Sequence, residues 1–152
     1  MRARTFCGAV VTAAALAVTG TGVANAQPTD HVNPTDYLIG DTVYFTAAGA
    51  NCSIRANGDV GCDIPAGIAK WLNVIPVRDL VIDVPFLPAH PTFGAFGPQG
   101  RADSRSLPGG PIGYGSTISY AGASCHGGGR GGLSCQSKGH SFSFGWSGTQ
   151  TS

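Results

Sequence analysis

Hydrophobic and polar residues alternate in several short stretches of this chain, and the clearest of them lies near the C-terminus. Over residues 140–146, the large side chains Phe142, Phe144 and Trp146 alternate with small ones. A period of two places the large side chains on one face of a β-strand. The pattern predicts a strand with these three aromatic residues facing a core, and an exposed aromatic strip for sugar or lipid binding is the alternative.

Two other stretches share a pattern of cysteines and glycines. The segment AGANC at residues 48–52 is repeated as AGASC at residues 121–125. In both copies a second cysteine follows at the same spacing, Cys62 in the first and Cys135 in the second. The repeat predicts two structurally equivalent β-hairpins.

The loop of each hairpin supports one register. When the two cysteines of a pair lie directly opposite each other, residues 56–58 and 129–131 become three-residue loops. The last position of such a loop favours a left-handed residue, and Gly58 and Gly131 occupy it. Cysteines placed opposite on neighbouring strands can bond. We therefore expect the disulfides Cys52–Cys62 and Cys125–Cys135.

The segments between the hairpins carry weaker signals. Residues 42–46 combine aromatic and β-branched side chains, which favours a strand. Residues 79–84 have a Leu-Val-Ile centre, and this indicates a central strand buried on both faces. Around Trp71 and Leu72 the mixed pattern indicates a short helical turn.

Residues 85–111 hold more than half of the ten prolines together with several glycines, so they cannot keep a regular hydrogen-bonded ladder. Three aromatic residues in this segment, Phe86, Phe93 and Phe96, indicate that it packs onto the sheet, because disordered segments have few aromatics. We expect a long ordered loop.

These patterns together predict an all-β fold. It should be a small antiparallel sandwich or open barrel, held by two disulfides and carrying a long Pro/Gly-rich loop. Residues 37–152 form the single domain, and residues 27–36 are expected to be a flexible N-terminal arm because they lack any period.

The first 26 residues have the layout of a secretory signal peptide. Two arginines precede an apolar stretch over residues 6–18, and the sequence ANA at residues 24–26 forms a cleavage site. We expect cleavage after Ala26 and release to the extracellular space or the cell envelope. The apolar stretch is too short for a membrane span, and no cysteine follows it to carry a lipid anchor.

Charge restricts the expected partners, and the number of cysteines indicates the compartment. Without the two arginines of the signal peptide, the mature chain has seven of the nine basic residues and eight acidic ones. No run of basic residues occurs. Nucleic acid and anionic membranes are therefore not expected as partners. The four cysteines of the mature chain are an even number, which suits disulfides in an oxidising compartment.

The exported N-terminus, the paired cysteine hairpins, PAHPTF at residues 88–93 and GHSF at residues 139–142 together resemble a known group. The chain is similar to small secreted proteins of uncharacterised function from mycolic-acid-bearing actinobacteria. The resemblance covers most of the mature chain and implies an envelope or extracellular address. It implies no activity and no catalytic residue.

Motifs for catalysis are incomplete. HGGG at residues 126–129 matches the oxyanion motif of some esterases, but the required Gly-x-Ser-x-Gly fails at its last glycine in residues 145–149. Asp79 and Asp83 could mimic a glycosidase pair, although their spacing better suits the two solvated ends of one strand. No catalytic residue is predicted.

Metal binding is also not predicted. Cys125, Cys135, His126 and His140 include the right elements for zinc, but the cysteines are too far apart in sequence for a structural zinc site. Secretion favours their oxidation to disulfides instead. We expect no metal and no other cofactor.

The favoured function is a non-catalytic secreted or envelope-associated module that binds an extracellular ligand or protein. The alternatives are a small secreted hydrolase and a secreted protease inhibitor that presents residues 85–111 or a hairpin tip as a rigid loop. The candidate binding residues are Arg130, His126, His90, Phe93 and Trp146.

Overall fold

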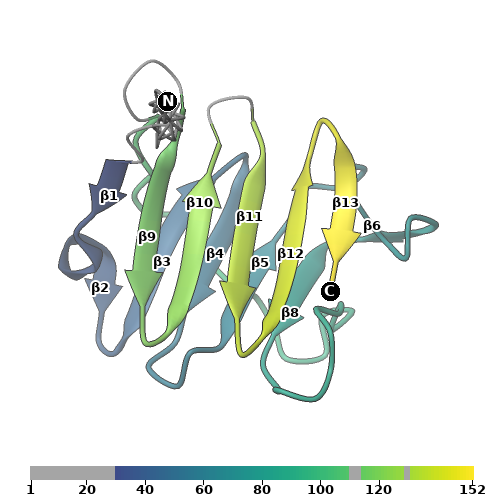
Figure 1. The fold of residues 1–152 in the computed structure, drawn as a ribbon, viewed down its shortest axis with the longest axis horizontal. Helices are drawn as coiled ribbons and strands as arrows, with labels where there is room; N and C mark the ends of the chain where they lie inside the picture. Colours follow the sequence, from purple (N-terminus) through teal and green to yellow (C-terminus); the bar gives the residue numbers. More distant parts are fainter. Residues whose placement is uncertain (1–29, 110–113, 129–130) are drawn as a thin grey trace, which may run out of the picture.

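The protein has an all-β fold in which two β-sheets face each other as the layers of a sandwich (Figure 1). The structure is a computed structural model that describes residues 30–109, 114–128 and 131–152. The expected signal peptide, the hairpin residue Arg130 and residues 110–111 of the long loop lie outside the described residues. In the described part of the chain, no helix is long and apolar enough to cross a membrane.

The larger layer is a six-stranded sheet. From β9 to β13 each strand pairs antiparallel with the next, whereas β1 joins the sheet parallel to β9. Its strands, in spatial order, are β1 (Asp30–Val32), β9 (Ser116–Tyr120), β10 (Ala123–Gly127), β11 (Leu133–Ser137), β12 (His140–Gly145) and β13 (Gly148–Thr151). Part of the segment expected to be a loose arm, residues 30–32, is therefore a strand in this sheet.

The second layer is a five-stranded antiparallel sheet. Its strands, in spatial order, are β2 (Leu38–Ile39), β3 (Thr42–Ala47), β4 (Ala50–Ile54), β5 (Val60–Asp63) and β8 (Asp79–Ile82). A short 3₁₀ helix, η1 (Pro34–Tyr37), leads into β2, and a separate hairpin of β6 (Ala69–Trp71) and β7 (Ile75–Val77) lies between β5 and β8 in the sequence.

The sequence repeat corresponds to a structural repeat. Strands β3, β4 and β5 form the same three-stranded meander in one sheet as β9, β10 and β11 form in the other. The first turn of each meander is an Ala-Gly pair with positive φ, 52° and 77° at Ala48 and Gly49 and 48° and 82° at Ala121 and Gly122. The two halves of the sandwich therefore share one local architecture.

Both predicted disulfides are confirmed. Cys52 lies opposite Cys62, Cys125 lies opposite Cys135, and each pair is bonded. The left-handed glycine of the first loop is also confirmed, with φ of 82° at Gly58. All four sulfur-bearing side chains are buried in the core between the sheets. Disulfides of this kind are typical of proteins that mature in an oxidising compartment.

The alternation in β12 is only partly confirmed as a core pattern. Phe142 and Phe144 are buried in the sandwich core, with ring centroids 6.3 Å apart. Trp146 was expected to join them, but its side chain is 93% exposed. The reason is that β12 ends at Gly145, so Trp146 belongs to the turn that leads to β13.

The long loop packs onto the five-stranded sheet, but not through its aromatic residues as expected. Phe86, Phe93 and Phe96 are exposed. The loop is held instead by its backbone: the Asp63 carboxylate accepts hydrogen bonds from the N–H groups of Gln99 and Gly100 at 3.0 and 2.8 Å. The Asp63 carboxylate takes the place of the water that would otherwise hydrogen-bond to these N–H groups.

The strand β8 was expected to be central, yet it lies at the edge of its sheet. The residues of β8 are all buried because the long loop covers the outer edge, where Val81 and His90 exchange backbone hydrogen bonds of 2.8 and 3.1 Å. Asp79 is therefore buried too, not a solvated strand end as predicted. A strand can therefore be buried on both of its faces without having a neighbouring strand along each edge.

The helical turn expected around Trp71 and Leu72 is wrong. These residues belong to the β6–β7 hairpin, in which Trp71 pairs with Ile75. Leu72 and Asn73 form its turn with φ of 52° and 62°. Asparagine tolerates this left-handed conformation, and a tight turn of this kind returns the chain as a strand instead of a helix.

Candidate functional site

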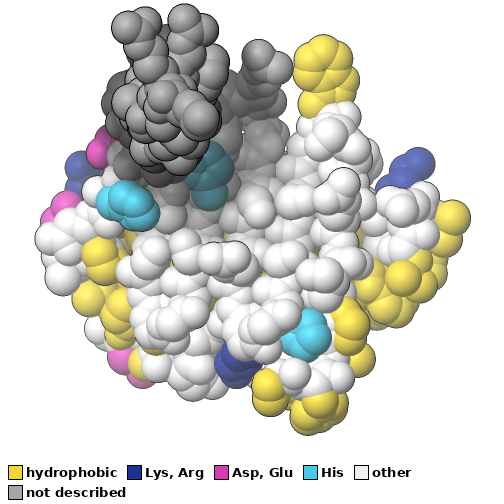
Figure 2. Space-filling model, viewed as in Figure 1, with side chains coloured by type: hydrophobic (Ala, Val, Ile, Leu, Met, Phe, Trp, Pro, Cys, Tyr) yellow, Lys and Arg dark blue, Asp and Glu magenta, His cyan; other side chains and the backbone are white. Residues whose placement is uncertain are grey.

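Exposed hydrophobic side chains gather in two segments of the molecule, the β6–β7 hairpin and the long loop. Of the eleven exposed large hydrophobic residues among those described, eight lie in these segments. Figure 2 shows such side chains clustered at the edge of the molecule around β6. We call this set the apolar surface; its members are Ile68, Leu72, Val74, Ile75, Phe86, Leu87, Phe93 and Phe96.

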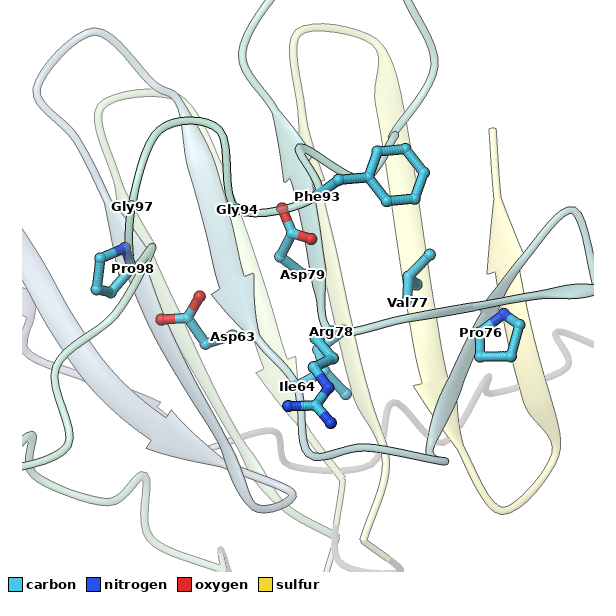
Figure 3. A pocket seen from close by; sticks show the side chains of 10 residues that line it. All are labelled: Asp63, Ile64, Pro76, Val77, Arg78, Asp79, Phe93, Gly94, Gly97 and Pro98. Atoms are coloured by element: carbon cyan, nitrogen blue, oxygen red, sulfur yellow. The ribbon is translucent and has the colours of Figure 1, made fainter.

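A groove of about 720 Å³ lies where the two segments meet. Pro76 and Val77 line it from the hairpin strand β7, and Phe93 and Pro98 line it from the long loop (Figure 3). Its volume falls in the range of protein ligand pockets, roughly 300–1,000 Å³. The groove is therefore large enough to take part of a ligand.

The carboxylates in the groove are engaged in holding the loop. Oδ2 of Asp79 accepts a 2.6 Å hydrogen bond from the N–H of Thr92 and another from its hydroxyl group. Asp63, on the neighbouring strand, holds the N–H groups at the far end of the loop segment. Because both carboxylates accept structural hydrogen bonds, we assign them to positioning the loop and not to acid/base chemistry.

Two members of the apolar surface have an unfavourable backbone conformation. Leu72 and Phe93 have φ of 52° and 53°, in the left-handed region that large side chains rarely adopt. Both side chains are also exposed, 61% and 68%. The φ of Leu72 follows from the tight β6–β7 turn, whereas Phe93 lies in the long loop, and strained residues in such loops are concentrated at functional sites.

Of the predicted binding residues, His90 and Phe93 lie in the same loop but only Phe93 lines the groove. His90 is close to two acceptors, with Nδ1 3.0 Å from the carbonyl oxygen of Pro88 and Nε2 3.6 Å from Oδ1 of Asp83. That carboxylate oxygen is buried and makes no hydrogen bond within the described residues, so the imidazole is its nearest charged partner when protonated. The contacts tie the loop to the end of β8 and offer no hydroxyl nucleophile to His90.

The other predicted binding residues lie elsewhere. His126 projects from β10 on the outer face of the six-stranded sheet, with Nδ1 3.0 Å from the hydroxyl oxygen of Thr117. Trp146 is in the turn between β12 and β13. The structure thus does not bring His126, His90, Phe93 and Trp146 into one site.

Neither shifted pKa values nor clusters of metal-binding side chains indicate another site in the described residues. The Arg101 guanidinium donates hydrogen bonds to the exposed Asp103 and lowers the pKa of that carboxyl group, while burial raises the pKa of the Tyr37 phenol. Neither group lines the groove. Within residues 30–109, 114–128 and 131–152, no cluster of three or more metal-binding side chains occurs.

The sequence analysis did not predict the part of the apolar surface that lies on the β6–β7 hairpin. Its signal was present, because Val74 and Ile75 follow Asn73, a residue typical of tight turns, and so belong to a returning strand. Comparison with protein-family models, curated proteins and solved structures found no match to this chain. The geometry of the site is therefore the basis for assigning a function.

Proposed function

We propose that this protein is a non-catalytic binding module of the extracellular space or cell envelope, which recognises its partner through the apolar surface. One observation carries the proposal: the exposed hydrophobic side chains are concentrated in two segments that line one groove. Soluble proteins rarely expose large apolar patches unless they mark an interaction site.

The chemistry of the groove favours a protein segment as the partner. The apolar surface extends over two chain segments, beyond what one small molecule in the groove would cover. The groove contains two carboxylates and the guanidinium of Arg78, so it has no excess of positive charge for an anionic lipid surface. Aromatic residues such as Phe93 are enriched at the cores of protein interfaces.

Substitution of Phe93 by asparagine tests this proposal. The mature protein, fluorescently labelled, is titrated onto cell envelopes isolated from the producing organism. We expect Phe93→Asn to weaken binding about tenfold or more, because an interface anchor contributes ~2 kcal/mol. The melting temperature should not fall, because asparagine adopts positive φ more readily than phenylalanine.

Ile39 provides the matched control, because it is 50% exposed but lies outside the apolar surface. Ile39→Asn should leave binding unchanged. Protease treatment of the envelopes should abolish the binding of the unsubstituted protein. Equal losses for the two variants, or binding that survives the protease, would contradict the proposal. So would turnover of ester, peptide or glycan substrates that a single His90→Ala or His126→Ala change eliminates, since this supports the hydrolase alternative.

A further inference from the structure

The outer face of the six-stranded sheet is a second surface, separate from the groove. Residues that lie directly opposite one another on β9 to β13 form a row of polar side chains across five strands. Alternate residues of a strand point to opposite faces, so this row lies on the side away from the core. Its members are Thr117, His126, Ser134, Ser143 and Gln150.

A second row runs parallel to the first, two residues along each strand. It joins Ser119, Ser124, Gln136 and Ser141 in the same register. The hydroxyl groups of Ser119 and Ser124 are 3.1 Å apart and hydrogen-bonded, as are Thr117 and His126 in the first row. The polar groups of the face are thus already positioned by one another.

The strands that form this face carry almost no charged side chains. In the six strands of the sheet, Asp30 is the only Asp, Glu, Lys or Arg residue. Figure 2 views the face directly, and the region over β10, β11 and β12 is almost free of charged and hydrophobic colours. Globular domains have about a quarter charged residues on average, whereas this chain has 11%, and the strands of this face hold fewer still.

Glycines continue the pattern beyond the first row. Gly145 pairs with Gly148, and the N–H of Gly128 donates a 2.7 Å hydrogen bond to the carbonyl oxygen of Gly132. A Cβ atom on Gly145 would lie 2.8 Å from the Cα of Gly132, so the strands approach too closely there for a side chain. These glycines leave no side chains above the half-buried backbone beside the turn that carries the exposed Trp146.

These features exclude several kinds of partner. Nucleic acids and anionic lipids need cationic side chains, which the strands of this face do not provide. A protein interface needs an apolar or aromatic anchor at its centre, whereas Ser134 and its neighbours across the strands are small and polar. A hydroxyl-bearing, uncharged and extended ligand remains.

We propose that the outer face of the six-stranded sheet binds a neutral polysaccharide chain. Hydroxyl and amide side chains both donate and accept hydrogen bonds, as the hydroxyl groups of sugars do, and no ion has to be desolvated. Neighbouring strands are ~4.8 Å apart, so the accessible part of the row, from His126 on β10 to Gln150 on β13, offers regularly spaced partners to several consecutive sugar units, while Thr117 at its end is buried. The exposed ring of Trp146, in the turn between β12 and β13, offers a further surface on which a sugar can stack.

Substituting Ser134 by a positive and, separately, by a negative residue tests the proposal. The affinity for a neutral ligand should change in the same direction with either charge. The mature protein is run in native gels that contain a soluble neutral glucan, mannan, galactan or arabinan, with polygalacturonate as the acidic comparison. At least one neutral polysaccharide should retard the protein equally at low and high salt. Ser134→Lys and Ser134→Glu should each lower its affinity about tenfold, since either charge loses water at the contact.

The exposed Ala66, in a turn beyond β5, provides matched controls: Ala66→Lys and Ala66→Glu should leave retardation unchanged. If circular dichroism shows a Ser134 variant to be unfolded, Ser143→Ala combined with Gln150→Ala removes hydrogen-bonding groups without adding charge and should weaken binding as well. Phe93→Asn should not affect it, which separates this site from the apolar surface.

Three results would overturn the proposal. The first is no retardation by any neutral polysaccharide, and the second is opposite effects of Ser134→Lys and Ser134→Glu, which indicate a charged ligand. The third is a dimer in sedimentation that both Ser134 variants dissociate, because the face would then be covered by a second copy of the chain.

Discussion

At the scale of single residues, the tight turns of this protein use alanine where the backbone is left-handed. Ala48 and Ala121 have φ of 52° and 48° at the first position of two-residue hairpin turns, each followed by a glycine. Such turns favour asparagine at that position, and a left-handed conformation costs an alanine roughly 1–2 kcal/mol. The turns form despite this cost because the pairing of the two strands that flank each turn offsets it.

Ala121→Asn is therefore expected to stabilise the protein. Ala121 is exposed, so the larger side chain meets no neighbour. The free energy of unfolding should rise by about 0.5–1 kcal/mol and the melting temperature by about 3 °C, measured by thermal denaturation. Ala66→Asn, at a position without positive φ, is the control and should give no gain. A destabilised Ala121→Asn would show that the turn differs from the one described.

At the scale of elements, the long loop is an ordered part of the sandwich because sheet residues satisfy its backbone. Asp63 accepts two of its N–H groups, and Ser53 donates a 2.5 Å hydrogen bond to the carbonyl oxygen of Gln99. A Cβ atom on Gly100 would lie 2.2 Å from the backbone of Asn51, so only glycine permits this close approach. The loop in turn covers the edge of β8 and positions Phe93 at the groove.

Asp63→Ala should detach this part of the loop. It leaves the N–H groups of Gln99 and Gly100 without their partner, at a cost of about 2–3 kcal/mol in the free energy of unfolding. Urea denaturation measures the loss, and amide exchange at Gln99 and Gly100 should accelerate. Asp103→Ala is the control, because Asp103 is exposed and pairs only with the neighbouring Arg101; it should cost less than ~0.5 kcal/mol. Equal losses would rule out the assigned role of Asp63.

At the scale of the whole molecule, two similar meanders are stacked face to face, and their turns are joined at one end. The ammonium group of Lys138, in the β11–β12 turn, pairs with Asp59 of the β4–β5 turn and donates a 2.7 Å hydrogen bond to the carbonyl oxygen of Asp83. Beside it, the Ser137 hydroxyl donates to the carbonyl oxygen of Gly58 at 2.6 Å. These contacts fix the two halves relative to each other.

The structural repeat predicts that the two disulfides stabilise the fold to a similar extent. Each joins cysteines separated by 10 positions, and each lies buried between the sheets. Replacing either pair by alanines should lower the free energy of unfolding by roughly 3 kcal/mol in the chain-entropy description. Chemical denaturation of the two double variants measures this. Losses that differ more than twofold would mean that the meanders are not energetically equivalent.

Sequence patterns predicted the parts of this protein that depend on local interactions. The opposite cysteines, the glycine at position 58 and the alternation of Phe142 and Phe144 are each specified within one hairpin or strand, so periodicity and turn chemistry suffice to place them. The all-β class followed from the same signals. The exposed position of Phe93 could not be predicted this way, because it depends on how Asp79 holds the loop.

The two cysteine hairpins, their registers and both disulfides follow from local sequence patterns, because residues close together in the chain decide them. Long-range packing was needed to show that β8 is an edge strand under a loop, that Trp146 is exposed, and that the two apolar segments line one groove. It also assembled the uncharged rows, whose members come from five strands. These features depend on contacts between residues far apart in the chain, and local patterns carry no information about which distant surfaces meet.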